Sequence, residues 1–484
     1  MFRHSQKPVV IIGAGPAGLT ASFQLSKRKI PSLVIEKDST VGGIARTVEY
    51  KGYRFDIGGH RFFTKVPEVM AMWKEVLGED FLKRPRLSHI YYNKKFFHYP
   101  IKPFDVLKKL GPVETGLAGL SFINSKIFKR PQENSFEDYI INNFGERLYK
   151  TFFKSYTEKV WGIPCTEIKA EWAAQRIKDL SFTSLVKTAF FGNRGNKIKT
   201  LIEEFYYPRF GPGMMWQKTK DLVEQSGYGK TLFDTVPVEI KHAGGKIISV
   251  RVRSKNGEMR TVELEAVISS MPLAEIFTLF SPRLETAAVQ AAASLNYRDF
   301  ITVALIVDRK DMFPDNWIYI HEPGVMVGRI QNFKNWSPDM VADSSKTCLG
   351  LEYFCFKTDP IWSMPDKDIV GLAGQELVKI GLAKKEEIVD GKVVRMEKTY
   401  PVYDDAYEKA MPAIKQTLAR FSNFYAVGRN GMHKYNNQDH AMYTAMLAVE
   451  NILDGKNHDL WKVNVERAYH EEAKADDKNY KSSA

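Results

Sequence analysis

The chain has 484 residues, of which 44% are hydrophobic, so it can bury a large core and is expected to form roughly two or three domains. Its 70 basic residues outnumber its 57 acidic residues, and the net charge of +13 predicts an anionic partner: a phosphorylated substrate, a nucleic acid or an acidic membrane surface. Three cysteines without CxxC spacing argue against a disulfide framework and a zinc site, so no metal and a reducing compartment are expected.

The first residues show a strand pattern rather than a signal peptide, and no apolar run approaches the roughly 20 residues that span a bilayer. We therefore expect a cytoplasmic protein that is soluble or bound at most to a membrane surface.

A glycine-rich turn follows the first predicted strand. PVVII, at residues 8–12, is typical of a buried parallel strand, and GAGPAGLTASFQLSKRK continues as a helix. Gly13, Gly15 and Gly18 lie at GxGxxG spacing, where glycines let backbone N–H groups at a helix N-terminus approach a pyrophosphate. The next predicted strand, SLVIEK, ends at Glu36, whose carboxylate can accept hydrogen bonds from a ribose diol. This order predicts a dinucleotide-binding unit.

Two further glycine pairs follow in VGGIARTVEYKGYRFDIGGHRFF. This stretch resembles the FAD-binding start of the amine-oxidase and protoporphyrinogen-oxidase superfamily, which favours FAD over NAD. The resemblance implies cofactor-binding roles for a set spread over this stretch: Gly42, Gly43, Arg46, Gly58, Gly59 and His60. A later segment, TVPVEIKHAGGKIISVRV with VELEAVISSMPL, resembles the strands near the adenosine end and adds Val238 to that set.

The remaining patterns predict an α/β protein with an interleaved domain order. A discontinuous Rossmann-like FAD-binding domain would contain residues 1–70, 205–282 and 412–455. Helical periodicity predicts a mainly helical substrate or lid domain at 71–204, and alternating patterns predict an antiparallel-sheet substrate domain at 283–411. A charged tail, 456–484, completes the chain.

A second resemblance covers the chain from residue 8 to about residue 452, and its matching segments occur in the same order along the sequence. The segments are similar to those of the UDP-galactopyranose mutases, more closely to their eukaryotic branch. The segments that carry it are RLSHIYYNKKFFHYP, YTEKVWGIPCTEIKAEWAAQR, FYYPRFGPGMMW, NWIYIHEPG with GRIQNFKNWSP, TYPVYDD and GRNGMHKYNNQDH.

This resemblance implies a FAD-dependent isomerase that interconverts the pyranose and furanose forms of a diphosphate-linked sugar without net redox. In the family, N5 of reduced FAD attacks the anomeric carbon, and NADPH or NADH would be the reductant. His60, Arg176 and Arg329 would be catalytic, with His60 beside N5 and the two arginines on the diphosphate.

The family pattern also implies two larger sets of binding residues. The substrate set is Phe63, Arg86, Tyr99, Trp161, Arg176, Tyr319, Arg329, Tyr400 and Tyr435. The cofactor set gains Gly428, Arg429, Asn437 and Gln438. Trp161 fits a core position equally well, because an aromatic residue at helical spacing is usually buried. No catalytic role is assigned to His433, Lys434 or His440.

Departures from the mutase pattern fall on the predicted base-recognition wall. Ile101 and Lys102 replace the Phe and Gln of the eukaryotic mutases, and Thr157 replaces an Asn. The expected substrate is thus a diphosphate-linked sugar on a nucleotide or a lipid carrier.

Several alternatives stay open. The first is an oxidase or desaturase of the protoporphyrinogen or carotenoid type, and the second is a non-enzymatic binder that keeps the fold. A nucleic-acid partner explains the charge but none of the motifs, so none is expected. The basic segments KPFDVLKKL and KIFKR leave peripheral contact with a membrane open, and an oligomer also stays open.

Overall fold

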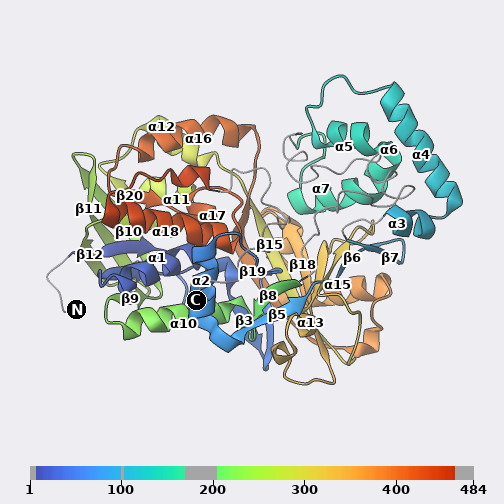
Figure 1. Ribbon diagram of the computed structural model, residues 1–484, viewed down its shortest axis with the longest axis horizontal. Helices are drawn as coiled ribbons and strands as arrows, with labels where there is room; N and C mark the ends of the chain where they lie inside the picture. The colour runs from blue at the N-terminus through green and yellow to red at the C-terminus, as the bar shows by residue number, and fades with distance from the viewer. Residues whose placement is uncertain (1–6, 100–102, 169, 171–203, 464–484) are drawn as a thin grey trace, which may run out of the picture. The chain divides into compact units, whose positions relative to one another are not determined.

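The computed structural model describes residues 7–99, 103–168, 170 and 204–463 (Figure 1). Its internal contacts divide the chain into two compact units. The first unit contains Met1–Leu82, Tyr206–Asp299 and Met396–Val465, and the second contains Lys83–Phe205, Phe300–Arg395 and Glu466–Ala484. Residues 71–204 and 283–411, expected as two separate domains, both contribute mainly to the second unit.

The first unit is built on a parallel sheet of five strands in the order β20-β13-β1-β2-β9. Every residue of β1 (Val9–Ile12) and β2 (Ser32–Ile35) is buried, as expected for strands covered on both faces. Helix α1 (Pro16–Lys27) packs against α18 (Gln438–Asp454), so the two ends of the sequence share one core. The predicted discontinuous Rossmann-like architecture is confirmed. A smaller four-stranded sheet in the same unit has the order β12-β11-β10-β14.

The first unit also contains further helices and strands and several short 3-10 helices, which carry the symbol η. They are η1 (Gly43–Ala45), β3 (Thr47–Tyr50), β4 (Tyr53–Asp56), α2 (Pro67–Leu77), η2 (Gly78–Asp80), α10 (Pro212–Gln225), β9 (Gly229–Leu232), β10 (Thr235–Ala243), β11 (Lys246–Ser254), β12 (Met259–Glu263), β13 (Val267–Ser269), α11 (Leu273–Ile276), η4 (Phe277–Leu279), β14 (Phe280–Ser281), α12 (Thr286–Ala293), α16 (Asp405–Leu418), β20 (Phe424–Ala426), α17 (Gly428–Gly431) and η7 (Leu460–Lys462). Strands β5 (Phe81–Pro85), β8 (Glu204–Pro208), β15 (Tyr297–Val307) and β19 (Ile388–Pro401) cross unit boundaries along the chain.

The second unit combines a seven-stranded sheet with a group of helices. The sheet order is β19-β15-β18-β17-β16-β6-β7. The expected antiparallel sheet is mixed, because β16 (Trp317–Ile320) runs parallel to β6 (Ser88–Tyr92) while it pairs antiparallel with β17 (Arg329–Asn332). The remaining elements are β7 (Lys95–His98), α3 (Pro103–Leu110), α4 (Pro112–Ile127), α5 (Phe136–Phe144), α6 (Glu146–Leu148), the π-helical turn η3 (Tyr149–Lys154), α7 (Ser155–Trp161), α13 (Phe333–Trp336), η5 (Pro338–Met340), β18 (Thr347–Cys355), α14 (Pro360–Ser363), α15 (Asp366–Lys379) and η6 (Lys385–Glu387).

Proline begins four of the longer helices. Pro16, Pro67, Pro112 and Pro212 stand at the first helical positions of α1, α2, α4 and α10, where the missing N–H leaves no hydrogen bond unmade. Within the described part of the chain, no helix combines the length and apolar character needed to cross a bilayer.

A buried carboxyl group joins three segments of the first unit. Asp56, at the end of β4, accepts hydrogen bonds from the Tyr207 hydroxyl at 2.6 Å and the Thr47 hydroxyl at 2.8 Å. Thr47 in turn accepts the Gly213 N–H at 3.0 Å. Burial raises the pKa of Asp56 to about 7.

Asp56→Asn should flatten the pH dependence of stability between about pH 4 and pH 7. Because its folded pKa is raised, the native carboxyl is most favourable below its unfolded pKa and destabilises the fold as pH rises to about 7, by at most about 4 kcal/mol. The stability advantage of the native protein over Asp56→Asn, measured by thermal unfolding at several pH values, should therefore shrink as pH rises.

Asp80→Asn is the control, because the ion pair with Lys218 lowers the pKa of Asp80. Here the advantage of the native protein should grow as pH rises through the acid range. Equal slopes for the two variants would contradict the raised pKa of Asp56.

Candidate functional site

The glycine loop after β1 leaves no space for side chains at Gly13 and Gly18. Gly13 has φ +100°, and a Cβ on it would lie 2.3 Å from Ser270 Oγ. A Cβ on Gly18 would lie 1.9 Å from the Gly13 carbonyl oxygen. Helix α1 starts after Gly15 without a side-chain cap, so its first N–H groups stay available to an outside acceptor. The loop therefore fits the close approach of a pyrophosphate.

The second glycine pair lies against the first loop. Gly42 donates its N–H to the Ala14 carbonyl at 2.9 Å, and a Cβ on Gly15 would be 4.0 Å from Gly42 O and from Gly43 Cα. Arg46 Nη1 binds Asp38 Oδ2 at 2.8 Å, so this guanidinium is anchored to the loop beyond β2. The structure brings these predicted residues together.

Glu36 organises both loops through main-chain contacts. The carboxylate is buried and accepts the Ala14 N–H at 2.7 Å and the Asp38 N–H at 2.9 Å. Burial raises its pKa. The spacing predicted a ribose-binding carboxylate, and the observed contacts give Glu36 an additional role in bracing the loop.

The loop at residues 58–63 contains a glycine turn and a phenylalanine side chain that is buried in the core. Gly58 has φ +89°, Gly59 is exposed, and His60 Nε2 lies 2.9 Å from the Ile57 carbonyl oxygen. Phe62 is buried and stacks on the Trp73 ring at 4.0 Å, whereas Phe63 is half-buried.

Val238 occupies an irregularity in the four-stranded sheet. The β10–β11 register shifts between Pro237 and Glu239, so Val238 is the extra residue of a bulge. Its predicted contact with the cofactor stays a prediction.

Arg429, in α17, binds the segment before α18 and strand β19, and lies near two predicted substrate tyrosines. Its Nε and Nη2 donate to the Asn436 carbonyl at 3.0 and 2.8 Å, and its Nη1 donates to the Thr399 carbonyl at 3.0 Å. The guanidinium carbon lies 5.4 Å from the ring centroid of Tyr400 and 4.9 Å from that of Tyr435. Arg429 therefore positions both phenols, a role that the sequence did not indicate.

Two neutral side chains, those of His440 and Trp216, make hydrogen bonds at the start of α18. Asn437 donates its N–H to His440 Nδ1 at 3.3 Å, and burial lowers the pKa of His440 to about 3, so the ring stays a neutral acceptor. Gln438 Oε1 accepts the Trp216 indole N–H at 3.0 Å. Helix α18 thus begins at Gln438, and the cofactor roles of Asn437 and Gln438 stay predictions.

His433 and Lys434, left without a role, are structural. His433 is fully buried, lies 4.5 Å from the Tyr297 ring centroid, and has a pKa lowered by burial to about 4. Lys434 Nζ donates to the carbonyls of Trp461 and Val463. Both residues hold the opening of α18 against the rest of the unit.

In the second unit, Tyr319, Arg329 and Glu352 form one row across three neighbouring strands. Tyr319 pairs with Arg329 between β16 and β17, and Arg329 pairs with Glu352 between β17 and β18. Arg329 Nε donates to Glu352 Oε2, while Gln331 Nε2 donates to Glu352 Oε1 at 2.6 Å. Glu352 is fully buried and Arg329 keeps 20% of its side chain exposed. A buried carboxylate thus holds a guanidinium at the sheet surface.

Aromatic rings extend this row toward the helices. Tyr319 lies 4.7 Å from the Tyr99 ring centroid and 5.5 Å from that of Tyr156. The Arg86 guanidinium lies 5.8 Å from the Tyr99 ring centroid. Trp161 is only 5% exposed and belongs to the helical core, the alternative that the sequence left open, so its stacking role stays a prediction.

Lys159 supports the strand that carries Tyr319. Its Nζ donates to the carbonyl oxygens of Ile320 at 3.2 Å and Glu322 at 2.8 Å. Burial lowers its pKa to about 8. Arg176, the other predicted diphosphate arginine, lies outside the described residues.

The arrangement in the first unit has the fold of a Rossmann-like dinucleotide-binding domain. The NAD(P)-binding Rossmann-like domain family matches residues 11–76. By fold the whole chain is similar to the crystal structure of reduced UDP-galactopyranose mutase, with a TM-score of 0.81, 20% sequence identity, and coverage of 95% of this chain and 98% of that one. The predicted mutase-like resemblance is therefore confirmed at the level of the fold.

Curated relatives match over shorter stretches. A 1-hydroxycarotenoid 3,4-desaturase of Flavobacterium sp. (strain P99-3) is 32% identical over 89 residues, 18% of each chain. A probable UDP-galactopyranose mutase of Klebsiella pneumoniae is 25% identical over 178 residues, which cover 34% of this chain and 44% of that protein. The chain thus spans less than half the length of these relatives.

Arg429→Met should destabilise the first unit, because the carbonyls of Asn436 and Thr399 lose their charged donor, at a cost of about 2 kcal/mol. Thermal unfolding should show a lower Tm, and near-ultraviolet circular dichroism should change because the stacked rings of Tyr400 and Tyr435 lose the cation beside them.

Arg420→Met is the matched control, since Arg420 forms an exposed ion pair with Glu285 and should leave Tm unchanged. An unchanged tyrosine signal in Arg429→Met would contradict the positioning role.

Proposed function

We propose that this protein is a FAD-dependent mutase that interconverts ring forms of a diphosphate-linked sugar. The observation that carries the proposal is the row of Tyr319, Arg329 and Glu352, which presents a guanidinium and a phenol at one place on the sheet. Planar guanidinium groups match the bidentate geometry of phosphate oxygens, and a buried carboxylate fixes the direction of this one.

The glycine loops fit FAD on steric grounds. Gly13, Gly15 and Gly18 with Gly42 and Gly43 would hold its pyrophosphate, and Glu36 would accept hydrogen bonds from its ribose. Arg46, Gly58, Gly59, Val238, Gly428, Asn437 and Gln438 complete the proposed cofactor site. When bound and reduced, FAD would supply the nucleophile for a reaction without net redox.

The protein's own residues would bind and orient the substrate. Arg329, with Arg176, would neutralise the diphosphate as it departs and hold it for recapture. Tyr319, Tyr400 and Tyr435 would donate hydrogen bonds to its oxygens, while His60 would stabilise the reduced cofactor. Phe63, Arg86 and Tyr99 would contact the rest of the substrate.

The desaturase match supports a second candidate, a FAD-dependent oxidoreductase that acts on an apolar substrate. The two candidates predict different ligands. A diphosphate needs positive charge at the site, and an apolar substrate does not.

Removing the guanidinium of Arg329 should weaken diphosphate binding to the reduced protein by roughly 30- to 100-fold, because a charge-assisted hydrogen bond contributes about 2–3 kcal/mol. Arg329→Met alone would leave Glu352 buried without its cation, which is strongly destabilising. The informative variant is therefore Arg329→Met with Glu352→Met, which removes both charges. Titration of UDP and UDP-galactose, followed through the flavin absorbance, measures the affinity.

Arg309→Met with Glu387→Met removes another ion pair of the second unit and serves as the control. The control should bind the nucleotides as the native protein does. Equal affinity in the two double variants, or perturbation of the flavin by a carotenoid and by no diphosphate, would contradict the mutase proposal.

A further inference from the structure

Helix α4 exposes an apolar face to solvent. Its side chains, together with the residue that follows the helix, have large exposed fractions: Val113 71%, Leu117 40%, Leu120 64%, Ile123 55%, Ile127 68% and Phe128 73%. Val113, Leu117, Leu120 and Ile127 recur at helical spacing on one side, while Ala118, Phe122 and Ser125 are buried. We call the six exposed residues the α4 stripe.

Exposed apolar side chains are concentrated in the α4 stripe and are not spread evenly over the described residues. It contains six of the thirteen large hydrophobic residues that are exposed within the described part of the chain. A helix that only covers a core directs its polar residues to water, so α4 has the opposite pattern. Contiguous apolar patches of this kind mark contact surfaces.

Basic residues lie at both ends of the α4 stripe. Between residues 103 and 130 there are two acids, Asp105 and Glu114, and five bases: Lys108, Lys109, Lys126, Lys129 and Arg130. The acids are bound locally, since Asp105 pairs with Lys109 and Glu114 pairs with Arg147 at 2.7 Å. Arg130 is neutralised by Glu137 and Asp138, and Lys129 lies 3.7 Å from Glu133. Lys108 and Lys126 keep positive charge at opposite ends.

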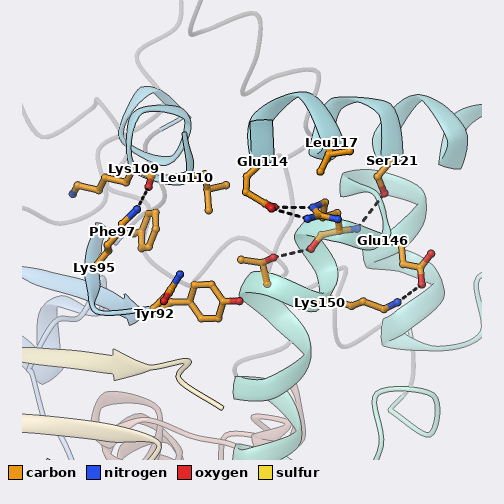
Figure 2. Close-up of a pocket in the computed structure, with 13 residues that line it drawn as sticks. Tyr92, Lys95, Phe97, Lys109, Leu110, Glu114, Leu117, Ser121, Glu146 and Lys150 are labelled. Carbon is orange, nitrogen blue, oxygen red and sulfur yellow. Dashed lines mark hydrogen bonds and ion pairs between the residues drawn. The ribbon is translucent and has the colours of Figure 1, made fainter. Parts of the chain in front are cut away.

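A cavity of about 510 Å³, lined by four basic and two acidic side chains among others, borders the same helix. Figure 2 shows that Glu114, Leu117 and Ser121 of α4 line one side of it, and that Lys95 and Lys109 reach it from the opposite side. Arg147 and Lys150 also line it, but Arg147 pairs with Glu114 at 2.7 Å and Lys150 pairs with Glu146 at 2.6 Å, so Lys95 and Lys109 carry its excess positive charge. Leu117 belongs to both the cavity and the α4 stripe, so the apolar stripe adjoins a lining in which bases outnumber acids.

We propose that the α4 stripe and the adjoining cavity dock on an anionic lipid surface. Side chains such as Leu120, Ile127 and Phe128 would enter the acyl boundary, and the lysines would face the phosphate groups. A second copy of this chain fits less well, because parallel or antiparallel pairing of α4 would bring basic ends together. The inference is independent of the reaction proposed above.

Vesicle binding by the full chain tests this docking surface. Sedimentation at about 0.1 M salt should recover the protein with vesicles of phosphatidylcholine and phosphatidylglycerol, but much less with phosphatidylcholine alone. Higher salt should weaken binding because it screens charge. Leu120→Glu with Ile127→Glu should lower the partition coefficient at least tenfold, and Lys108→Gln with Lys126→Gln should lower it severalfold on anionic vesicles only.

Ile248→Glu with Met259→Glu changes two exposed apolar residues of the first unit, 41% and 43% exposed, and is the matched control that should bind normally. All variants should keep the native circular dichroism. Equal vesicle binding by the stripe variant and the control would overturn the proposal. An oligomer that dissociates in Leu120→Glu with Ile127→Glu, without vesicle binding by the native protein, would also overturn it and assign the stripe to self-association.

Discussion

The buried ion pair between Glu352 and Arg329 is the constraint on which the candidate substrate site depends. A carboxylate with no exposed surface is very unfavourable unless cations and hydrogen-bond donors surround it, and here Arg329 and Gln331 fill that need. This ion pair also fixes the orientation of the Arg329 guanidinium. The Arg329 guanidinium donates through Nε to Glu352 of the neighbouring strand and lies beside Tyr319, so the same interaction stabilises the strands and orders the group that we propose binds the diphosphate.

In the first unit a buried carboxylate is likewise stabilised by donors, which here are main-chain N–H groups. Glu36 is buried because it accepts N–H groups from Ala14 and Asp38, and this fixes the glycine loop near the turn at Gly42. Arg429 binds carbonyl groups on two segments and lies near the rings of Tyr400 and Tyr435. In each unit a charged side chain forms its hydrogen bonds within the protein. These bonds hold the neighbouring groups rigidly in a position where a ligand can contact them.

Sequence patterns predicted the parts of the fold that local periodicity determines. The glycine spacing, the apolar strand before it and Glu36 after it led directly to the parallel sheet and α1. The row of Tyr319, Arg329 and Glu352 could be anticipated only in part, because Glu352 lies in an apolar strand and its partner becomes visible only in the strand register. The position of Trp161 in a core and the contacts of Arg429 with carbonyl groups depend on tertiary packing, which no local spacing reports. The parallel pairing of β6 with β16 joins segments more than two hundred residues apart. Local sequence patterns therefore could not predict that this sheet is mixed.

The most direct measurement of the central claim is the composition of a sugar-diphosphate pool after turnover without air. The protein reduced with dithionite is incubated with UDP-galactopyranose, other nucleotide sugars and a polyprenyl-diphosphate sugar, and nuclear magnetic resonance then separates furanose from pyranose signals. The account predicts that one of these pools reaches a mixture of ring forms at constant total oxidation state, and that the oxidised protein leaves every pool unchanged. Unchanged ring composition in all pools, together with consumption of oxygen or a quinone on an apolar substrate, would contradict it.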